Sequence, residues 1–235
     1  MGRIRFRDRE DAGRQLAVEL RDYAKDHPIV LAIPNGGVPV GFEVSRALGC
    51  ELDFWVVKKL AVPWHPELGV GAIAEGGQLS IARAMIEDIN LSGVELANVT
   101  EIARRASADR VSKYRGARPK PDLRMRTVIV IDDGLFTGGT AHAAIESLRA
   151  QSPRQIVLAV PVGAPGVVSR VGQRVERVVC LNTPTELYAL GLWYDDFPRV
   201  SDEQAMRFIE RAQQAFATSQ AAARNANAAL PVPAR

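Results

Sequence analysis

An apolar run followed by two acids and a glycine-rich loop constrains the fold of this 235-residue chain more than any other stretch. Residues 128–131 (Val-Ile-Val-Ile) have no polar alternation, which is typical of a strand buried on both faces in a parallel sheet. Asp132 and Asp133 end that strand, and a short loop then leads into an amphipathic segment, residues 141–148. The stretch therefore predicts one strand-loop-helix unit of an α/β fold.

The loop of this unit is predicted to bind a phosphate. Its backbone N–H groups lie in the first helical turn, where they have no intrahelical acceptor and where the helix dipole favours an anion. The residues that we assign to substrate binding here are Gly134, Thr137, Gly138, Gly139 and Thr140. Asp132 and Asp133 repel phosphate, so their targets are vicinal sugar hydroxyls or a hydrated divalent cation. The site is therefore predicted to hold a sugar phosphate.

These residues resemble the 5-phosphoribosyl-1-pyrophosphate (PRPP) motif of the type I phosphoribosyltransferases. The resemblance covers about residues 6–212 and is nearest to bacterial members whose acceptor is undefined. It implies a doubly wound α/β fold with a mainly parallel sheet, a small hood at about residues 186–200 and a flexible lid loop.

The resemblance also implies an enzyme of the pentosyltransferase class of glycosyltransferases. Such an enzyme uses PRPP and Mg²⁺ to transfer a 5-phosphoribosyl group to an acceptor, here unidentified but with nucleobases among the candidates, and releases pyrophosphate. Asp132 and Asp133 would act as catalytic residues that hold the ribose hydroxyls. Magnesium would be bound through PRPP and would contact both acids through water.

A second glycine-containing loop follows the apolar run at residues 29–33, which predicts another buried strand. Loops at the carboxyl ends of parallel strands share one crevice, so Asn35, Gly36 and Gly37 are expected to bind the same ligand. The N–H groups of the two glycines suit a second anion, the pyrophosphate half of PRPP. In the family that the chain resembles, a basic residue commonly stands at Asn35. Unless backbone donors or a nearby lysine compensate, its loss would weaken pyrophosphate binding by about 1.5 to 3 kcal/mol.

Two lysines and a long irregular stretch follow the next predicted strand, residues 53–57. Lys58 and Lys59 stand at its carboxyl end, where ammonium groups can neutralise a pyrophosphate leaving group. The resemblance makes Lys59 the catalytic contact. Lys58 is a substrate-binding candidate, and the alternative is that it is a solvated lysine at the end of a strand. Residues 61–77 hold many prolines and glycines, which predicts a lid over the reaction centre. His65 lies within this stretch. We interpret it as a surface residue, with the role of a general base as the alternative.

An aromatic pair and one loop residue bear on the acceptor. Trp193 and Tyr194 lie where the family places residues that stack on a flat acceptor, with a core-filling aromatic cluster as the alternative. In relatives that use 6-oxopurines, an acid precedes the threonine of the phosphate loop. Phe136 takes that place here and cannot exchange a proton, which disfavours a hypoxanthine or guanine acceptor handled by that mechanism.

The composition is that of an ordinary soluble protein. With 47% hydrophobic residues the chain can bury the core of one domain, residues 1–212, and the Ala-rich residues 213–235 are predicted to form a disordered tail. No apolar run reaches membrane-spanning length and the first residues are not signal-like, so we expect a cytoplasmic protein with no membrane partner. Cys50 and Cys180 lack metal-ligand spacing, so we expect neither a disulfide framework nor a metal held by the protein alone.

Two rival functions stand beside the enzyme. A non-catalytic PRPP- or nucleotide-sensing regulatory module is favoured by Asn35 and Phe136, whereas the acid pair and the lid-like stretch favour the enzyme. The basic residues 104–126 suggest RNA binding, but Tyr114 is their one aromatic for base stacking, so we do not expect nucleic acid as a partner. The expected partners are PRPP and a small-molecule acceptor, and a homodimer is a candidate because dimers are common among relatives.

Overall fold

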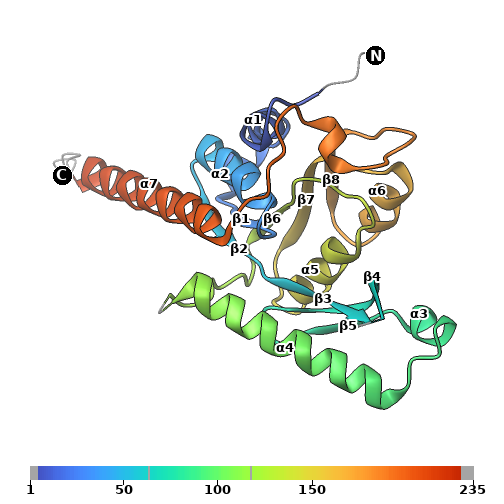
Figure 1. The fold of residues 1–235 in the computed structure, drawn as a ribbon. Coiled ribbons are helices and arrows are strands. Elements are labelled where there is room, and N and C mark those ends of the chain that lie inside the picture. The colour runs from blue at the N-terminus through green and yellow to red at the C-terminus, as the bar shows by residue number, and fades with distance from the viewer. Residues whose placement is uncertain (1–4, 63, 117, 229–235) are drawn as a thin grey trace.

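Two sheets organise the part of the chain that the computed structural model describes, residues 5–62, 64–116 and 118–228 (Figure 1). The larger is a five-stranded parallel sheet with the order β2-β1-β6-β7-β8, and the smaller is an antiparallel sheet with the order β3-β4-β5. The larger sheet consists of β1 (Ile29–Ala32), β2 (Glu51–Phe54), β6 (Thr127–Ile131), β7 (Gln155–Val162) and β8 (Arg177–Asn182). The smaller sheet consists of β3 (Val57–Val62), β4 (His65–Ala74) and β5 (Leu79–Ile81).

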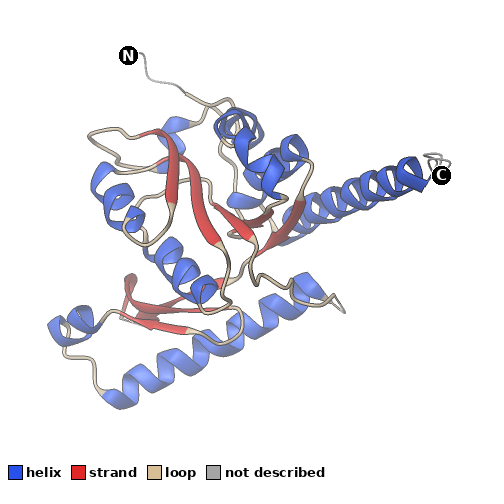
Figure 2. Ribbon diagram, turned by 180° about the vertical axis from the view of Figure 1, so that it is seen from behind, coloured by secondary structure: helices blue, strands red, loops and turns tan. Residues whose placement is uncertain are grey.

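Helices cover both faces of the larger sheet, as the doubly wound prediction requires (Figure 2). The helices are α1 (Arg9–Glu19), α2 (Gly37–Leu48), α3 (Arg83–Asp88), α4 (Gly93–Arg115), α5 (Gly139–Arg149), α6 (Pro165–Gly172) and α7 (Asp202–Ala228), with 3₁₀ turns η1 (Arg21–Asp26) and η2 (Leu190–Trp193). Val30 and Ala32 of β1 belong to a core shared with α1, α2 and α7, whereas Ile29 and Leu31 belong to a core shared with α5 and α6. This alternation buries β1 on both faces, which confirms the prediction made from its apolar run.

The register of the parallel strands brings the two predicted ligand loops together. Ala32 of β1 pairs with Ile131 of β6, and the N–H of Ile33 donates to Ile131 O at 2.8 Å. Both strands therefore end at the same edge of the sheet. The loop before α2 and the loop before α5 start side by side there, as expected for an α/β sheet.

The region predicted as an irregular lid forms strands instead. Residues 61–77 include β4, so the loop prediction is wrong for most of that stretch. The glycines serve close strand packing, because a Cβ on Gly71 would lie 2.2 Å from the Ser80 carbonyl oxygen of β5. Lys58 and Lys59 lie inside β3 and are exposed, so their predicted place at the carboxyl end of a strand of the larger sheet is also wrong.

The smaller sheet packs between α4 and α5. Leu60 and Val70 share an apolar cluster with Val99 and Ala103 of α4, and both β3 and β4 contact α5. Ser92 caps α4 in a capping box with Glu95, which fixes the start of that helix. The smaller sheet therefore lies beside the helix that carries the phosphate loop (Figure 1).

The C-terminal helix is longer than the sequence predicts. We expected a disordered tail from residue 213 onward, but α7 continues to Ala228 and extends away from the sheets (Figure 1). Alanine has the highest helix propensity, so an Ala-rich segment continues a helix that packing has already started. Residues 229–235 lie outside the described part. No described helix is both long and apolar enough to cross a membrane.

Candidate sugar phosphate site

The loop between β6 and α5 has the geometry of an anion site. Gly138 takes a left-handed conformation with φ 80° and caps α5, and the first bond within the helix runs from the His142 N–H to Gly138 O at 2.8 Å. The N–H groups of Gly139 and Thr140 precede that bond, so they have no acceptor inside the helix. Thr137 and Thr140 are exposed, and a Cβ on Gly139 would meet nothing within 4 Å. Backbone and hydroxyl donors are thus open to a ligand.

Gly134 has a packing role in the same loop. A Cβ at this position would lie 2.4 Å from the Leu190 side chain of η2. The residue therefore lets the start of the loop lie against the predicted hood. The contact with Leu190 explains why glycine is required at this position. The role of Gly134 in substrate binding stays a prediction.

Replacing Gly138 with alanine is expected to lower affinity for inorganic phosphate about tenfold or more, the value of one charge-assisted hydrogen bond. A Cβ there would lie 2.6 Å from Val167 Cγ1, and φ 80° strains any other residue, so the turn must change and move the N–H groups. Isothermal titration with phosphate measures the loss.

Gly49→Ala is the matched control for that variant. Gly49 also has a positive φ, 61°, but nothing lies within 4 Å of its Cβ position, and it ends α2 at the opposite end from the loop. The Gly49→Ala variant should lose about 1 to 2 kcal/mol of folding free energy, which is the strain of one left-handed residue. Its affinity for phosphate should stay unchanged. Equal phosphate affinity in both variants would contradict the assignment of the loop.

The two acids that follow β6 occupy different environments. Asp132 Oδ1 accepts a hydrogen bond from the Asp133 N–H at 2.9 Å. Burial, and after it the neighbouring Asp133 carboxylate, raise the pKa of Asp132 well above its usual range. The carboxylate of Asp133 instead accepts from Arg9 Nε at 2.8 Å, and both side chains are nearly buried. One acid is therefore compensated by a cation of the protein.

Arg9 is a site residue that our sequence reasoning missed. It comes from the first turn of α1, capped by Asp8, and its Nη1 donates to Pro198 O at 2.7 Å. The sequence did contain a signal for it. A cation in the first turn of a helix is disfavoured by the helix dipole, so its presence there indicates a stabilising partner elsewhere. Here that partner is an acid far away in the sequence.

The loop before α2 packs directly on the acid pair. A Cβ on Gly36 would lie 2.0 Å from Asp133 Oδ2, and one on Gly37 would lie 2.6 Å from Ile131 O. The Gly37 N–H donates to Ile33 O at 3.1 Å, so it is already used within the turn. The structure therefore explains both glycines by close approach, and it places Gly36 against Asp133. The binding of ligand by these two glycines stays a prediction.

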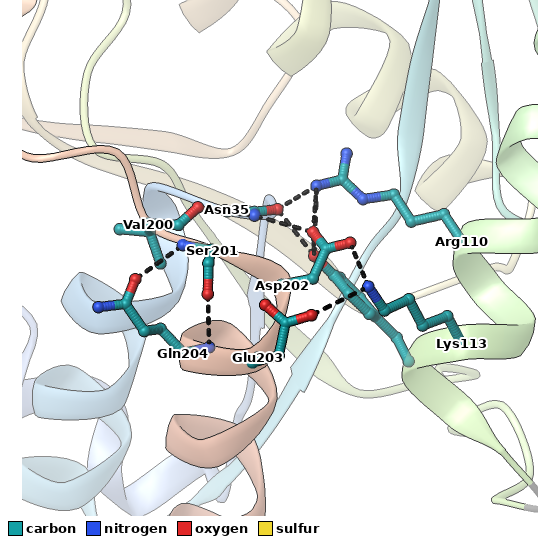
Figure 3. A network of polar contacts seen from close by, with 9 residues as sticks. Asn35, Arg110, Lys113, Val200, Ser201, Asp202, Glu203 and Gln204 are labelled. Atoms are coloured by element: carbon teal, nitrogen blue, oxygen red, sulfur yellow. Dashed lines mark hydrogen bonds and ion pairs between the residues drawn. The ribbon is translucent and has the colours of Figure 1, made fainter.

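The side chain of Asn35 bonds to protein groups on α7 and α4 (Figure 3). Its Nδ2 donates to Val200 O at 2.9 Å and to Asp202 Oδ1 at 3.0 Å. Its Oδ1 accepts from the guanidinium of Arg110, and the hydroxyl of Tyr114 lies 2.7 Å from the same oxygen. The amide thus connects the loop to two helices. The predicted contact of Asn35 with the ligand stays a prediction.

This network fixes the charge states of its acid and its phenol. Asp202 accepts from Asn35, Tyr114 and Lys113, in that order of effect, and these bonds hold its pKa well below the usual range. Burial and the bond to Asp202 raise the pKa of Tyr114 to about 12. Lys113 Nζ lies 2.9 Å from Asp202 Oδ2, and Arg110 Nη2 lies 3.4 Å from Oδ1. Arg110, a second residue that we missed, therefore brings a positive charge to the loop before α2.

The aromatic pair predicted to stack on the acceptor is buried. Trp193 and Tyr194 are 8% and 2% exposed and share an apolar cluster with Phe6. The Tyr194 ring stacks on Phe197 with centroids 4.6 Å apart, and its hydroxyl donates to Asp133 O at 2.6 Å. The core-filling alternative is the one observed. Tyr194 nevertheless belongs to the site, because it holds the backbone of an acid.

The basic stretch that suggested RNA binding is largely paired within the chain. Arg115 is buried between two carboxylates, and other cations of the stretch pair with acids of α4, α7, β2 or their own loop. These exposed or part-exposed pairs are Arg105–Glu101, Lys113–Asp202, Arg124–Asp122 and Arg126–Glu51. Whether nucleic acid is a partner is not tested by this pairing, and its absence stays a prediction.

Comparison with known proteins gives consistent matches. The model of the phosphoribosyl transferase domain family matches residues 6–185. A Mycobacterium tuberculosis H37Rv protein named, provisionally, as a phosphoribosyl transferase is 40% identical over 217 residues, 90% of this chain and 48% of that protein. The crystal structure of TT1426 from Thermus thermophilus is 38% identical, covers 87% of this chain and 97% of its own, and has a TM-score of 0.76.

A shorter match reaches a relative whose name states an acceptor. The uracil phosphoribosyltransferase of Lacticaseibacillus paracasei is 35% identical over 72 residues, 31% of each chain. The chain spans about half the length of the M. tuberculosis relative.

Proposed function

This chain belongs to the phosphoribosyl transferase domain family, and on that premise we propose that it transfers a 5-phosphoribosyl group from PRPP to a small-molecule acceptor. The observation that carries the proposal is the junction of three features at one edge of the sheet. The phosphate loop, the acid pair and the glycine loop before α2 all meet there. Their chemistry suits the phosphate, the ribose and the pyrophosphate of one ligand.

The proposed reaction exchanges one bond at the ribose C1 atom for another. The bond from C1 to the pyrophosphate oxygen breaks, and the leaving group takes the electron pair. The acceptor donates its electron pair to C1 and loses a proton, which the departing pyrophosphate or water accepts. Because negative charge gathers on pyrophosphate, catalysis consists mainly of holding the reactants in place and stabilising that charge.

The chain's own residues divide this work by position. In the proposal, N–H and hydroxyl groups of residues 137–140 hold the 5-phosphate, and a carboxylate of the acid pair accepts from the ribose hydroxyls. The backbone around Gly36 faces the pyrophosphate, with Lys59 and Lys58 supplying positive charge from the smaller sheet. The exposed lysines of β3 would have to approach the larger sheet for that contact.

Magnesium is proposed to arrive with PRPP. Among the described residues, no group of three or more His, Cys, Asp or Glu side chains is arranged to hold a metal ion. A cation bound by the diphosphate needs no such group, and Asp132, with its partly buried carboxylate, fits a contact to its hydration shell. The cation would neutralise the developing charge of the leaving group.

The acceptor is proposed to be a nucleobase-like molecule other than a 6-oxopurine activated by an acid in the loop. Phe136 is 45% exposed beside the phosphate loop, where it offers an apolar ring and no proton. Uracil is included among the acceptors to be tested because of the local similarity to a uracil phosphoribosyltransferase. By family resemblance we also propose a cytoplasmic location and a homodimer.

A sensing module that binds PRPP without turnover is the second candidate. The bonds of Asn35 favour it, because a side chain that connects α4 and α7 to the ligand loop can transmit the bound state to those helices. The exposure of Lys58 and Lys59 on a separate sheet also favours it.

Titration calorimetry with PRPP, with and without magnesium, tests the proposal. We expect binding of PRPP that strengthens with magnesium, and separate binding of ribose 5-phosphate and of pyrophosphate. Release of pyrophosphate in an acceptor screen then separates the enzyme from the sensor. Binding of ribose 5-phosphate alone, with no response to PRPP or pyrophosphate, would contradict the transferase.

A further inference from the structure

We propose that Arg9 is a positioning residue that holds Asp133 in the framework of the site, and that Asp132 is the acid that contacts the sugar. The two acids are adjacent in sequence and alike in chemistry, so nothing in the motif separates their roles. The inference rests on the proposed function, because it assumes that the site binds a sugar phosphate.

Arg9 is fixed by three contacts, which come from two separate parts of the chain. Its Nε donates to Asp133 Oδ2 at 2.8 Å, and its Nη1 donates to Pro198 O at 2.7 Å. Its guanidinium carbon lies 3.6 Å from the centre of the Phe197 ring, close enough for a cation–π contact. With 8% of its surface exposed, Arg9 is held in one orientation. Its first-turn position opposes the dipole of α1, so these contacts must offset that placement.

Asp133 is nearly buried and is contacted from α1, from the glycine loop and from the hood. Arg9 binds its Oδ2 from one side, and Gly36 packs against the same oxygen from another, with a Cβ there placed 2.0 Å away. Its backbone carbonyl accepts from the Tyr194 hydroxyl at 2.6 Å. A carboxylate in these surroundings is a structural anchor between α1, the hood and the glycine loop.

Asp132 keeps capacity for a ligand. Among the described residues, the Asp133 N–H is the group that we find bonded to its carboxylate, at Oδ1. A carboxylate has about four acceptor positions, so Asp132 can accept from two vicinal hydroxyls while it keeps that bond. Arg9 also offsets part of the charge of Asp133, which lessens the repulsion between the acid pair and a phosphorylated sugar.

The test compares how strongly each variant prefers ribose 5-phosphate over inorganic phosphate, measured by calorimetry well below the melting temperature. This ratio isolates the contribution of the sugar, which a merely structural role of Arg9 would not change. Asp132→Asn should reduce the preference about tenfold or more, the value of a hydrogen bond to a charged group. Asp133→Asn keeps an oxygen for Arg9 and should reduce it less than about threefold.

Arg9→Met should reduce the preference by about three- to tenfold because Asp133, and with it the N–H bonded to Asp132, can move. Arg9→Lys should recover part of the preference for ribose 5-phosphate. If Arg9→Met does not fold, Arg9→Lys is measured in its place. Arg14→Met is the matched control, since Arg14 also leaves α1 to pair with a buried acid, Glu43, but touches neither site acid. It should keep the full preference.

Two outcomes would overturn the inference and can be told apart. If the unaltered chain prefers ribose 5-phosphate and Asp133→Asn loses as much of that preference as Asp132→Asn, Asp133 contacts the sugar itself. If the preference is unchanged in Arg9→Met, Arg9 has no positioning role. If the unaltered chain shows no preference at all, the proposed function fails together with the inference.

Discussion

Replacing Arg115 with methionine is expected to lower the free energy of unfolding by about 3 to 5 kcal/mol, the usual result of leaving buried charges without their partner. Arg115 ends α4 and is 6% exposed. Its Nε lies 2.5 Å from Glu75 Oε1, and its Nη1 lies 2.7 Å from Asp53 Oδ2. Glu75 and Asp53 are themselves buried, so both carboxylates would remain inside the protein without a cation.

Urea denaturation followed by circular dichroism measures this loss, with Arg126→Met as the control. Arg126 pairs with Glu51 at 2.9 Å, but that pair is 28% and 40% exposed and should contribute less than about 1 kcal/mol. Adding Asp53→Asn and Glu75→Gln to Arg115→Met should restore part of the stability, because the charges left behind are removed. A loss in Arg115→Met no larger than in Arg126→Met would show that water or pKa changes compensate the acids.

The Arg115 cluster also shows why part of the fold escaped prediction. Asp53 lies on β2, Glu75 follows β4 and Arg115 ends α4, so their meeting depends on how three distant segments pack. No local pattern contains that information. The hairpin of β3 and β4 escaped for a related reason, since glycines that allow close strand packing resemble glycines of a mobile loop.

The parts that were predictable have short-range causes. The strand at β6 follows from continuous β-branched residues, and the loop before α5 follows from glycine, threonine and helix-end chemistry within a few residues. The meeting of the loops after β1 and β6 follows from parallel-sheet geometry. Arg9 and Arg110 contact those loops from distant parts of the sequence. Such long-range contacts could not be predicted from local sequence patterns.

Replacing Asp132 with asparagine is expected to lower phosphoribosyl transfer at least 100-fold and, at neutral pH, to raise the free energy of unfolding. The loss of activity follows from the removal of the charged acceptor for the ribose hydroxyls. The gain in stability follows from the raised pKa, because a folded state that favours the protonated acid is penalised when the acid ionises. Asparagine keeps the oxygen that accepts from the Asp133 N–H.

The sign of the pH dependence separates this gain from a general packing effect. The penalty of the ionised Asp132 is full above its raised folded pKa and vanishes as pH falls below the ordinary value of 3.8, where folded and unfolded chains are both protonated. The stability difference between the variant and the unaltered chain should therefore shrink as pH falls, in urea denaturation at a series of pH values. Asp133→Asn should show the opposite sign at neutral pH, since it leaves the nearly buried Arg9 without its carboxylate. Stabilisation by both substitutions would mean that Arg9 does not compensate Asp133, and the unequal roles of the two acids would have to be abandoned.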